Sequence, residues 1–248
     1  MKLLALEFCK CRRRKLTLVC AGLLAAQLLW FGAYLTQQDA EALAQGWMLL
    51  LYNLAMVDAI MLPIGVAVIA SRSCELEHRG HTLKLLETAV TPGRLYAAKL
   101  AWGAWCWPAC SCARRPLSGP GPCHGLPRRD AWGRFVVFTA LSWAVSMTLY
   151  ALQQGLSLRF ANQAVALVCG IFGSFVGLMA LLFPVWVQRC VPWGYYGLLS
   201  LVRMEWDEAT RWTAFFWRRP EPLDLALLCL WAALFLTVGR TLFVRKEV

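Results

Sequence analysis

The chain carries few charged side chains, and this scarcity excludes most soluble folds. Only 16% of its 248 residues are Asp, Glu, Lys or Arg, whereas 59% are hydrophobic. Soluble domains typically have about 25% charged and about 45–50% apolar residues. A chain of this length cannot bury so much apolar surface within itself, so lipid has to cover part of it. The composition therefore predicts an integral membrane protein.

The sequence also lacks the motifs that would give the chain a chemistry of its own. It contains no Gly-x-x-x-x-Gly-Lys-Ser/Thr loop, no Gly-x-Ser-x-Gly elbow and no His-Glu-x-x-His helix. Its three histidines, His78, His81 and His124, do not form a ligand set with a carboxylate. We therefore predict that the chain is not an enzyme and holds no cofactor and no metal. Any ATP that drives its work has to be bound by a partner.

Cysteine is frequent, with 11 residues, but its placement does not indicate a disulfide framework. Cys20, Cys169 and Cys229 fall within apolar runs, where cysteine acts as a small apolar residue. Cys9, Cys11 and Cys74 are expected to face a reducing cytoplasm. No disulfide is therefore predicted.

Apolar runs of about 20 residues, the length that crosses a bilayer core, predict six membrane spans. Their approximate limits are 16–36, 47–70, 95–112, 133–154, 163–185 and 224–243. The third run is degraded by Pro108 and by the pair Arg114-Arg115 that follows it. We expect an all-α integral membrane protein, in which residues 1–248 form one six-span helical bundle.

The stretch from Ala104 to Asp130 differs from its surroundings in composition. It is rich in Pro, Arg, Cys and Gly, and the apolar pattern resumes abruptly at Trp132. Cys106, Cys110, Cys112, Cys123 and His124 do not have the paired spacing of a zinc site. Two interpretations stay open, a segment read out of frame and a divergent extracytoplasmic loop.

The net charge of +11 comes from basic residues that lie beside the spans, so it does not indicate nucleic-acid binding. Lys10, Arg12, Arg13, Arg14 and Lys15 precede the first span, whereas the loop after that span, 37–46, has no Lys or Arg. Basic residues favour cytoplasmic loops. We predict a multi-pass protein of the cell membrane with both termini in the cytoplasm.

The residues ahead of the first span combine apolar side chains with this basic block. The apolar group is Leu3, Leu4, Leu6 and Phe8. Such a segment can lie in the membrane interface as an amphipathic helix attracted to anionic lipid. A plain charge cluster that sets the topology is the other reading, and the two are compatible.

Span two contains a carboxylate, Asp58, with Asn53 about one turn away and Pro63 beyond it. A charge at that depth is costly and often functional. One hypothesis is an intramembrane polar site for substrate or ions formed by Asn53 and Asp58. The other is a hydrogen bond inside the bundle. Pro63 should kink the helix.

Span five carries Gly170, Gly173 and Gly177 near one face. Small residues at such spacing let helices approach closely. The face fits either packing within the chain or contact with a second protomer.

After span five, a segment expected on the outer side of the membrane contains several tryptophans among arginines. They are Trp193, Trp206, Trp212 and Trp217, and an interfacial aromatic belt explains them.

The densest mixed charge lies between two apolar runs, from Ser71 to Lys99. Residues 75–89 predict a helix that ends at Thr91-Pro92-Gly93, because proline disfavours helical geometry in the residue before it. Its apolar stripe consists of Leu76, Gly80, Leu83, Leu86 and, just beyond, Val90. An ordinary solvated helix in a loop is the alternative to a docking element.

The order of residue types in this segment resembles that of the loop between spans two and three of ABC-2-type transporter permeases. In that family the loop carries a coupling helix, which docks on a separate ATP-binding subunit. The resemblance implies that role for Glu75, Glu77, His78, Gly80, Thr82, Leu83, Lys84, Leu85 and Leu86. It also implies an ABC ATP-binding subunit and a second permease subunit, the same or related, as partners in the lipid bilayer.

A narrower resemblance concerns span five and the run Val191-Pro-Trp-Gly-Tyr-Tyr-Gly that follows it. Both look like permeases of lantibiotic self-protection exporters. The resemblance implies a permease that exports an amphipathic peptide such as a lantibiotic when a separate ATPase acts on it. The alternatives are an intramembrane lipid-modifying enzyme and a non-transporting membrane adaptor.

Overall fold

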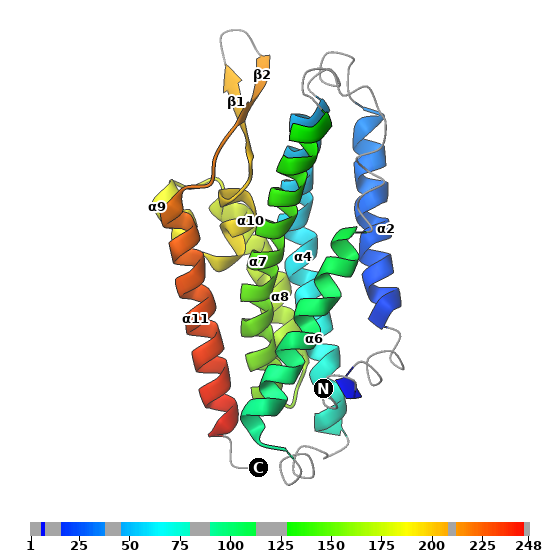
Figure 1. Ribbon diagram of the computed structural model, residues 1–248, viewed down its shortest axis with the longest axis vertical. Coiled ribbons are helices and arrows are strands. Elements are labelled where there is room, and N and C mark those ends of the chain that lie inside the picture. The colour runs from blue at the N-terminus through cyan, green and yellow to red at the C-terminus, as the bar shows by residue number, and fades with distance from the viewer. Residues whose placement is uncertain are drawn as a thin grey trace.

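The computed structural model describes residues 6–7, 16–37, 46–79, 90–112, 128–207 and 212–245. In the described part, long helices stand side by side in one elongated bundle, and a β-hairpin projects from one end (Figure 1). We call that end the hairpin end. The opposite end, where α6 begins and α11 finishes, carries the exposed Arg94, Arg240 and Arg245, and we call it the basic end.

Six helices of the described part coincide with the six predicted apolar runs. They are α2 (Leu16–Leu35), α4 (Gly46–Arg79), α6 (Pro92–Cys112), α7 (Arg128–Arg159), α8 (Ala164–Ala180) and α11 (Pro222–Val244). Three stretches are long and apolar enough to cross a membrane, namely Gly46–Glu75, Trp132–Arg159 and Pro222–Val244. Ala21–Tyr34 and Ala164–Ala180 are apolar but shorter. The chain is thus a mostly helical, multi-pass membrane protein, and the count of six spans stays a prediction.

Helix α4 is the centre of the bundle, and α11 lies at its periphery. Of the most apolar window of each helix, 72% is buried in α4 but only 17% in α11. Side chains from α4, α7, α10 (Tyr195–Leu198) and α11 share one core, which includes Val66, Tyr150, Tyr195 and Leu228. Because lipid tails are as apolar as these side chains, close van der Waals packing rather than water exclusion holds the helices together.

Helix α4 is longer than the sequence suggested. We expected span two to end near residue 70 and a separate helix to begin at Glu75, but α4 continues without a break to Arg79. Pro63 lies inside this continuous helix. Helix α6 begins at Thr91-Pro92-Gly93, with Pro92 at the first helical position, and the predicted end of the preceding helix falls on residues that the structure does not describe. Proline suits that position because the missing N–H would have no helical partner there.

Helix α8 is shorter than the predicted span, because it ends at Ala180 rather than near residue 185. The chain then forms α9 (Val185–Cys190), the 3-10 turn η2 (Pro192–Gly194) and α10. This segment folds back onto the bundle, with Tyr195 and Tyr196 buried in the core. These apolar side chains complete the core beside the short α8, and the expected position of this segment on the outer side of the membrane stays a prediction.

The all-α prediction is wrong at residues 202–207 and 212–217, which pair as two antiparallel strands. Strands β1 (Val202–Asp207) and β2 (Trp212–Trp217) pair from Val202↔Trp217 to Asp207↔Trp212. Aromatic and β-branched side chains favour such strands. At the base of the hairpin, the ring of Phe215 lies 5.3 Å from that of Tyr52 in α4. Contacts of this kind anchor the hairpin to the bundle.

Candidate functional site

The basic end contains a fully buried lysine, Lys99 of α6. Its Nζ donates to the backbone oxygen of Ser73 in α4 at 3.0 Å and lies 3.3 Å from Oε2 of Glu7. The side chains of Lys99 and Glu7 are both 0% exposed. Lys99 is the last residue of the charged stretch that begins at Ser71, and the structure places its side chain inside the bundle. One ammonium group thus joins α4, α6 and the segment that precedes α2.

Residues 73–75 of α4 are also buried near this lysine. Ser73, Cys74 and Glu75 are all buried, and the Glu75 carboxylate accepts from Arg72 at 3.1 Å. We expected Glu75 to be the first residue of a separate helix between spans two and three. In the structure it lies on the face of α4 that packs against the bundle, with Arg72 exposed next to it.

The other predicted coupling residues continue from this point. Glu77 and His78 belong to α4, but nothing is described of their side chains. Gly80, Thr82, Leu83, Lys84, Leu85 and Leu86 lie outside the described residues. The coupling helix therefore stays a prediction, and it would follow directly on the continuous helix α4.

Asp58 pairs across helices rather than with Asn53. Its side chain is 0% exposed, and its Oδ1 accepts from Nε2 of Gln27 in α2 at 3.2 Å. Asn53 donates to the Leu49 oxygen of its own helix at 3.0 Å. The two residues of the predicted polar site are therefore not joined to each other, and Gln27 is the partner that sequence reasoning missed. The polar contact links α2 to α4 inside the apolar bundle.

Helix α8 approaches α4 through Gly170. A Cβ added at Gly170 would overlap the side chain of Ala67 and would lie 3.5 Å from the backbone oxygen of Pro63. The amide of Gln153 in α7, in its satisfied orientation, donates to the Ala166 oxygen at 2.8 Å and accepts from the Gly170 N–H at 3.2 Å. The small residue thus lets three helices meet closely beside the proline of α4.

Gly173 and Gly177 lie against the segment that folds back, not against another long helix. A Cβ at Gly173 would overlap the indole of Trp193, and one at Gly177 would lie 2.6 Å from the Cβ of Trp193. Trp193 follows Pro192 in η2. The glycine face is therefore covered within the chain, by an indole that the sequence suggested for the membrane interface.

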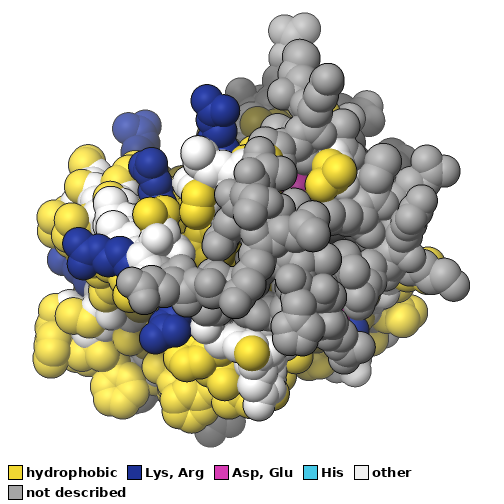
Figure 2. Space-filling view, turned by 90° about the horizontal axis from the view of Figure 1, so that it is seen from below, with side chains coloured by type: hydrophobic (Ala, Val, Ile, Leu, Met, Phe, Trp, Pro, Cys, Tyr) yellow, Lys and Arg dark blue, Asp and Glu magenta, His cyan; other side chains and the backbone are white. Residues whose placement is uncertain are grey.

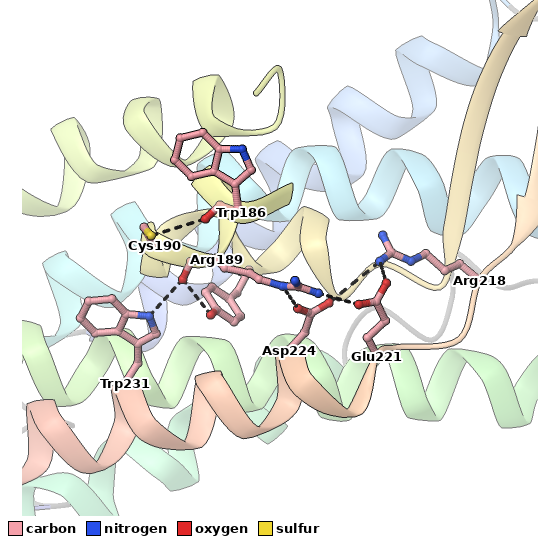
Figure 3. Close-up of polar contacts among 8 residues, drawn as sticks. Trp186, Arg189, Cys190, Arg218, Glu221, Asp224 and Trp231 are labelled. Carbon is pink, nitrogen blue, oxygen red and sulfur yellow. Dashed lines mark hydrogen bonds and ion pairs between the residues drawn. The ribbon is translucent and has the colours of Figure 1, made fainter. Parts of the chain in front are cut away.

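Two arginines and two acids form an ion-pair cluster near the hairpin end (Figure 3). Arg189 of α9 contacts Asp224 at 2.6 Å and Glu221 at 2.5 Å. Arg218, just after β2, contacts Glu221 at 2.9 Å. Asp224, in the first turn of α11, is 0% exposed, whereas Glu221 is 48% exposed. The cluster ties α9 and the end of the hairpin to the start of α11.

The backbone and the charge of Arg189 are both held in place. Its carbonyl oxygen accepts from the Tyr195 hydroxyl at 2.9 Å and from the Trp231 indole at 3.4 Å (Figure 3). The hydrogen bond to Asp224 is the main cause that raises the pKa of Arg189 above its ordinary value. A raised pKa favours the charged form, so this arginine keeps its charge throughout the physiological range.

The described residues hold no group of three or more His, Cys, Asp or Glu that could bind a metal ion. Cys74, Cys169, Cys190 and Cys229 form no disulfide. Cys106, Cys110 and Cys112 belong to α6 but their side chains are not described, and Cys123 and His124 lie outside the described residues.

Comparison with known proteins supports the resemblance noted in the loop. No match is found among curated proteins. Residues 3–112, which are less than half of the 248, match the family model described as "ABC-2 family transporter protein". The matched region runs from the segment containing Glu7 to the end of α6, and thus includes the whole stretch from Ser71 to Lys99. The first part of this chain is therefore similar to the membrane proteins of ABC-2-type transporters.

Proposed function

We propose that this chain is the membrane-spanning permease subunit of an ABC exporter, energised by a separate ATP-binding subunit. The observation that carries the proposal is the family match across 3–112, which includes the segment between α4 and α6. The bundle of long apolar helices gives the fold that a permease requires. A partner ATPase is needed because the sequence has no loop of its own to hold ATP phosphates.

The geometry of the basic end suggests how a push from the ATPase would reach the membrane. A force applied at Glu75–Leu86 would act on the end of α4, one continuous helix from Gly46 to Arg79. Lys99 links α4 to α6 through the Ser73 oxygen and to the N-terminal segment through Glu7. The three elements would therefore move together, and α4 would carry the motion to the buried contact between Asp58 and Gln27.

The Asp58–Gln27 contact is the polar position that this motion would change. It joins α2 to α4 inside apolar surroundings, where a hydrogen bond has few alternatives. A rotation of α4 against α2 would separate the two groups and expose a carboxylate to whatever occupies the space between them. In this proposal the Asp58 site takes part in the change by which the permease opens alternately to the two sides of the membrane. Both termini and the basic end lie in the cytoplasm.

A second permease subunit, the same chain or a relative, completes the proposed transporter. Helix α8 turns several large apolar side chains outward, of which Val168 is 63%, Phe172 68% and Phe175 55% exposed. In the membrane such a face meets either lipid or another helix. The proposed substrate is an amphipathic peptide such as a lantibiotic, because residues 162–177 and 191–197 resemble self-protection permeases. Export of this peptide would protect the cell that makes it.

Co-purification with an ABC ATP-binding subunit tests the permease assignment. The test variant Glu77→Lys/Leu83→Asp changes the predicted coupling segment. The matched control Glu205→Lys/Met204→Asp makes the same kinds of change on exposed residues of β1. We expect the first variant to lose the ATPase and the control to retain it. Equal recovery with all three proteins would overturn the docking role.

A survival assay tests the substrate separately. Sensitive cells that express the chain with its ATPase should tolerate more lantibiotic than cells with the ATPase alone. If the wild-type chain co-purifies with the ATPase but gives no gain in tolerance, the lantibiotic is rejected and the permease assignment stands. Asp58→Asn removes the carboxylate while its amide oxygen can still accept from Gln27, so we expect a folded protein with reduced tolerance.

A further inference from the structure

An open apolar groove lies on the outside of the bundle between α6, α7 and α11. Its volume is about 180 Å³. Its walls include Leu100 of α6, Met147 and Thr148 of α7, and Leu228, Ala232 and Leu236 of α11. The Thr148 hydroxyl donates to the Ala144 oxygen at 3.0 Å, so it does not offer an open polar group to the groove. The groove therefore suits hydrocarbon, and an apolar cavity of about 150 Å³ is already large enough for benzene.

The groove exists because α6 crosses the bundle obliquely. At the basic end α6 and α11 touch, since a Cβ at Gly239 would lie only 2.7 Å from the Tyr96 hydroxyl. Towards the hairpin end α6 leans away from α11 and towards α2 (Figure 1). The wedge between the two helices is floored by α7, and Leu228 to Leu236 line it over about 12 Å of helix rise.

Arginine side chains lie at the basic end of this wedge. The guanidinium of Arg240 crosses the seam between α11 and α6, because its Nη2 would lie 3.4 Å from a Cβ at Gly93. Arg94 and Arg245 are exposed nearby in sequence, on α6 and after α11. Among the described residues, none of these three arginines forms an ion pair with an acid. Arg240 lies four residues from Leu236, or about 6 Å along the helix axis.

The face of the molecule at this end shows the same imbalance. Lys and Arg side chains gather over the half of the face where α11 lies, and scarcely any Asp or Glu is visible among the coloured atoms (Figure 2). Anionic headgroups attract basic residues at a membrane surface. The charge therefore complements a phosphate placed beside Arg240 and Arg94, with hydrocarbon extending from it along the apolar groove.

From this juxtaposition we infer that the α6–α7–α11 groove is a binding site for one anionic phospholipid of the leaflet at the basic end. One acyl chain lies in the groove, and the phosphate contacts Arg240 and Arg94. The lipid fills the wedge between α6 and α11 and so supports the oblique packing of α6, whose Lys99 is anchored on the inside of the bundle. This inference does not depend on the proposed export of a peptide.

Photolabelling of the full chain in nanodiscs tests the site. The probes are phosphatidylglycerol and phosphatidylcholine, each with a diazirine in one acyl chain, and mass spectrometry maps the labelled residues. We expect phosphatidylglycerol to label the groove more than phosphatidylcholine does. Arg94→Gln and Arg240→Gln should each reduce groove labelling by phosphatidylglycerol about fivefold and leave that by phosphatidylcholine unchanged.

A second pair of variants tests the groove itself. Ala232→Trp fills it and should abolish groove labelling, whereas Leu230→Trp changes a lipid-facing side chain of α11 that is 65% exposed and should not. Equal labelling by the two probes would overturn the inference. So would labelling of Leu230 and Leu234 as strong as that of the groove, which would indicate ordinary bulk lipid. Crosslinking of two chains through Cys229, which lines the groove, would assign it to a second copy instead.

Discussion

The two ends of the bundle use charge in opposite ways. Near the hairpin end, Arg189 and Arg218 are paired with Glu221 and Asp224, and the cluster fastens short segments to the start of α11. At the basic end, the described ion pairs belong to the buried interior and the last turns of α4, whereas Arg94, Arg240 and Arg245 remain exposed. Charge at the hairpin end therefore ties segments of the fold together, whereas the exposed arginines at the basic end form no ion pair with a described acid.

This contrast matters because the hairpin end contains the less regular parts of the chain. Helix α8 stops early, and α9, η2, α10 and the hairpin are too short to span the bilayer. Their positions depend on specific contacts such as the Arg189 cluster and the Trp193–glycine contact. At the basic end, long helices already fix the backbone, so exposed cations there can serve lipid or an ATPase without a structural role.

The largest effect should follow from breaking the buried contact of the basic end. Lys99→Met leaves the buried Glu7 without its ammonium partner, and breaking a buried pair typically costs about 3–5 kcal/mol. We expect a marked fall in the thermal midpoint of the detergent-purified protein, measured by size-exclusion chromatography after heating. Glu7→Gln/Lys99→Met removes both charges and should recover part of the loss. A midpoint equal to wild type in the single variant would refute this role of Lys99.

At the hairpin end, the buried acid should matter more than the exposed one. Asp224→Asn weakens charged hydrogen bonds of a fully buried side chain, which typically contribute about 1.5–3 kcal/mol. Glu221→Gln affects a half-exposed side chain and should have a smaller effect, because exposed pairs contribute little. The same heating assay compares the two variants. The reverse order would show that the cluster does not act through Asp224.

Packing at the hairpin end can be tested without any change of charge. Gly177→Ala places a methyl group 2.6 Å from the Cβ of Trp193 and 2.7 Å from its backbone carbon. Such overpacking typically costs about 1–3 kcal/mol. Gly22→Ala is the matched control, since nothing lies within 4 Å of its added Cβ. If both variants melt like wild type, η2 does not depend on this close approach.

The smallest effect on stability is expected for the exposed arginines of the basic end. Arg94→Gln and Arg240→Gln should each change the free energy of unfolding by no more than about 0.5 kcal/mol in detergent, as is usual for surface substitutions. Their effect should appear only when lipid is present, in the photolabelling described above. A loss of stability in lipid-free detergent comparable to that of Asp224→Asn would remove the contrast between the two ends.

Much of the helical framework could be predicted from hydropathy. The runs 16–36, 47–70, 95–112, 133–154 and 224–243 each coincide with a described helix, although α4 and α7 extend well beyond the predicted limits. Hydropathy predicts the apolar part of a helix, but it does not predict the polar turns that extend the helix at its ends. For that reason the last turns of α4 were assigned to the connection between spans two and three, with a separate helix beginning at Glu75.

The contacts of the candidate sites were less predictable. Alternation in Val202-Arg-Met-Glu-Trp-Asp was a signal for β1, but six residues among tryptophans also fit an interfacial segment. Nothing in the sequence paired Gln27 with Asp58, which are 31 residues apart, or Arg189 with Asp224. The single signal for the Trp193 contact was the glycine spacing of span five, and it did not identify the partner.

The sequence by itself determined that this protein belongs in a membrane, where its helices run, and which loop resembles a docking element. These properties follow from local composition, because the bilayer selects apolar runs of a given length and obliges each to satisfy its own backbone. Only the tertiary structure decided which buried polar groups meet, how α8 and Trp193 pack, and where α6 leaves a groove against α11. Those outcomes depend on contacts between residues that are far apart in the sequence, and a local sequence pattern does not show which of these residues meet.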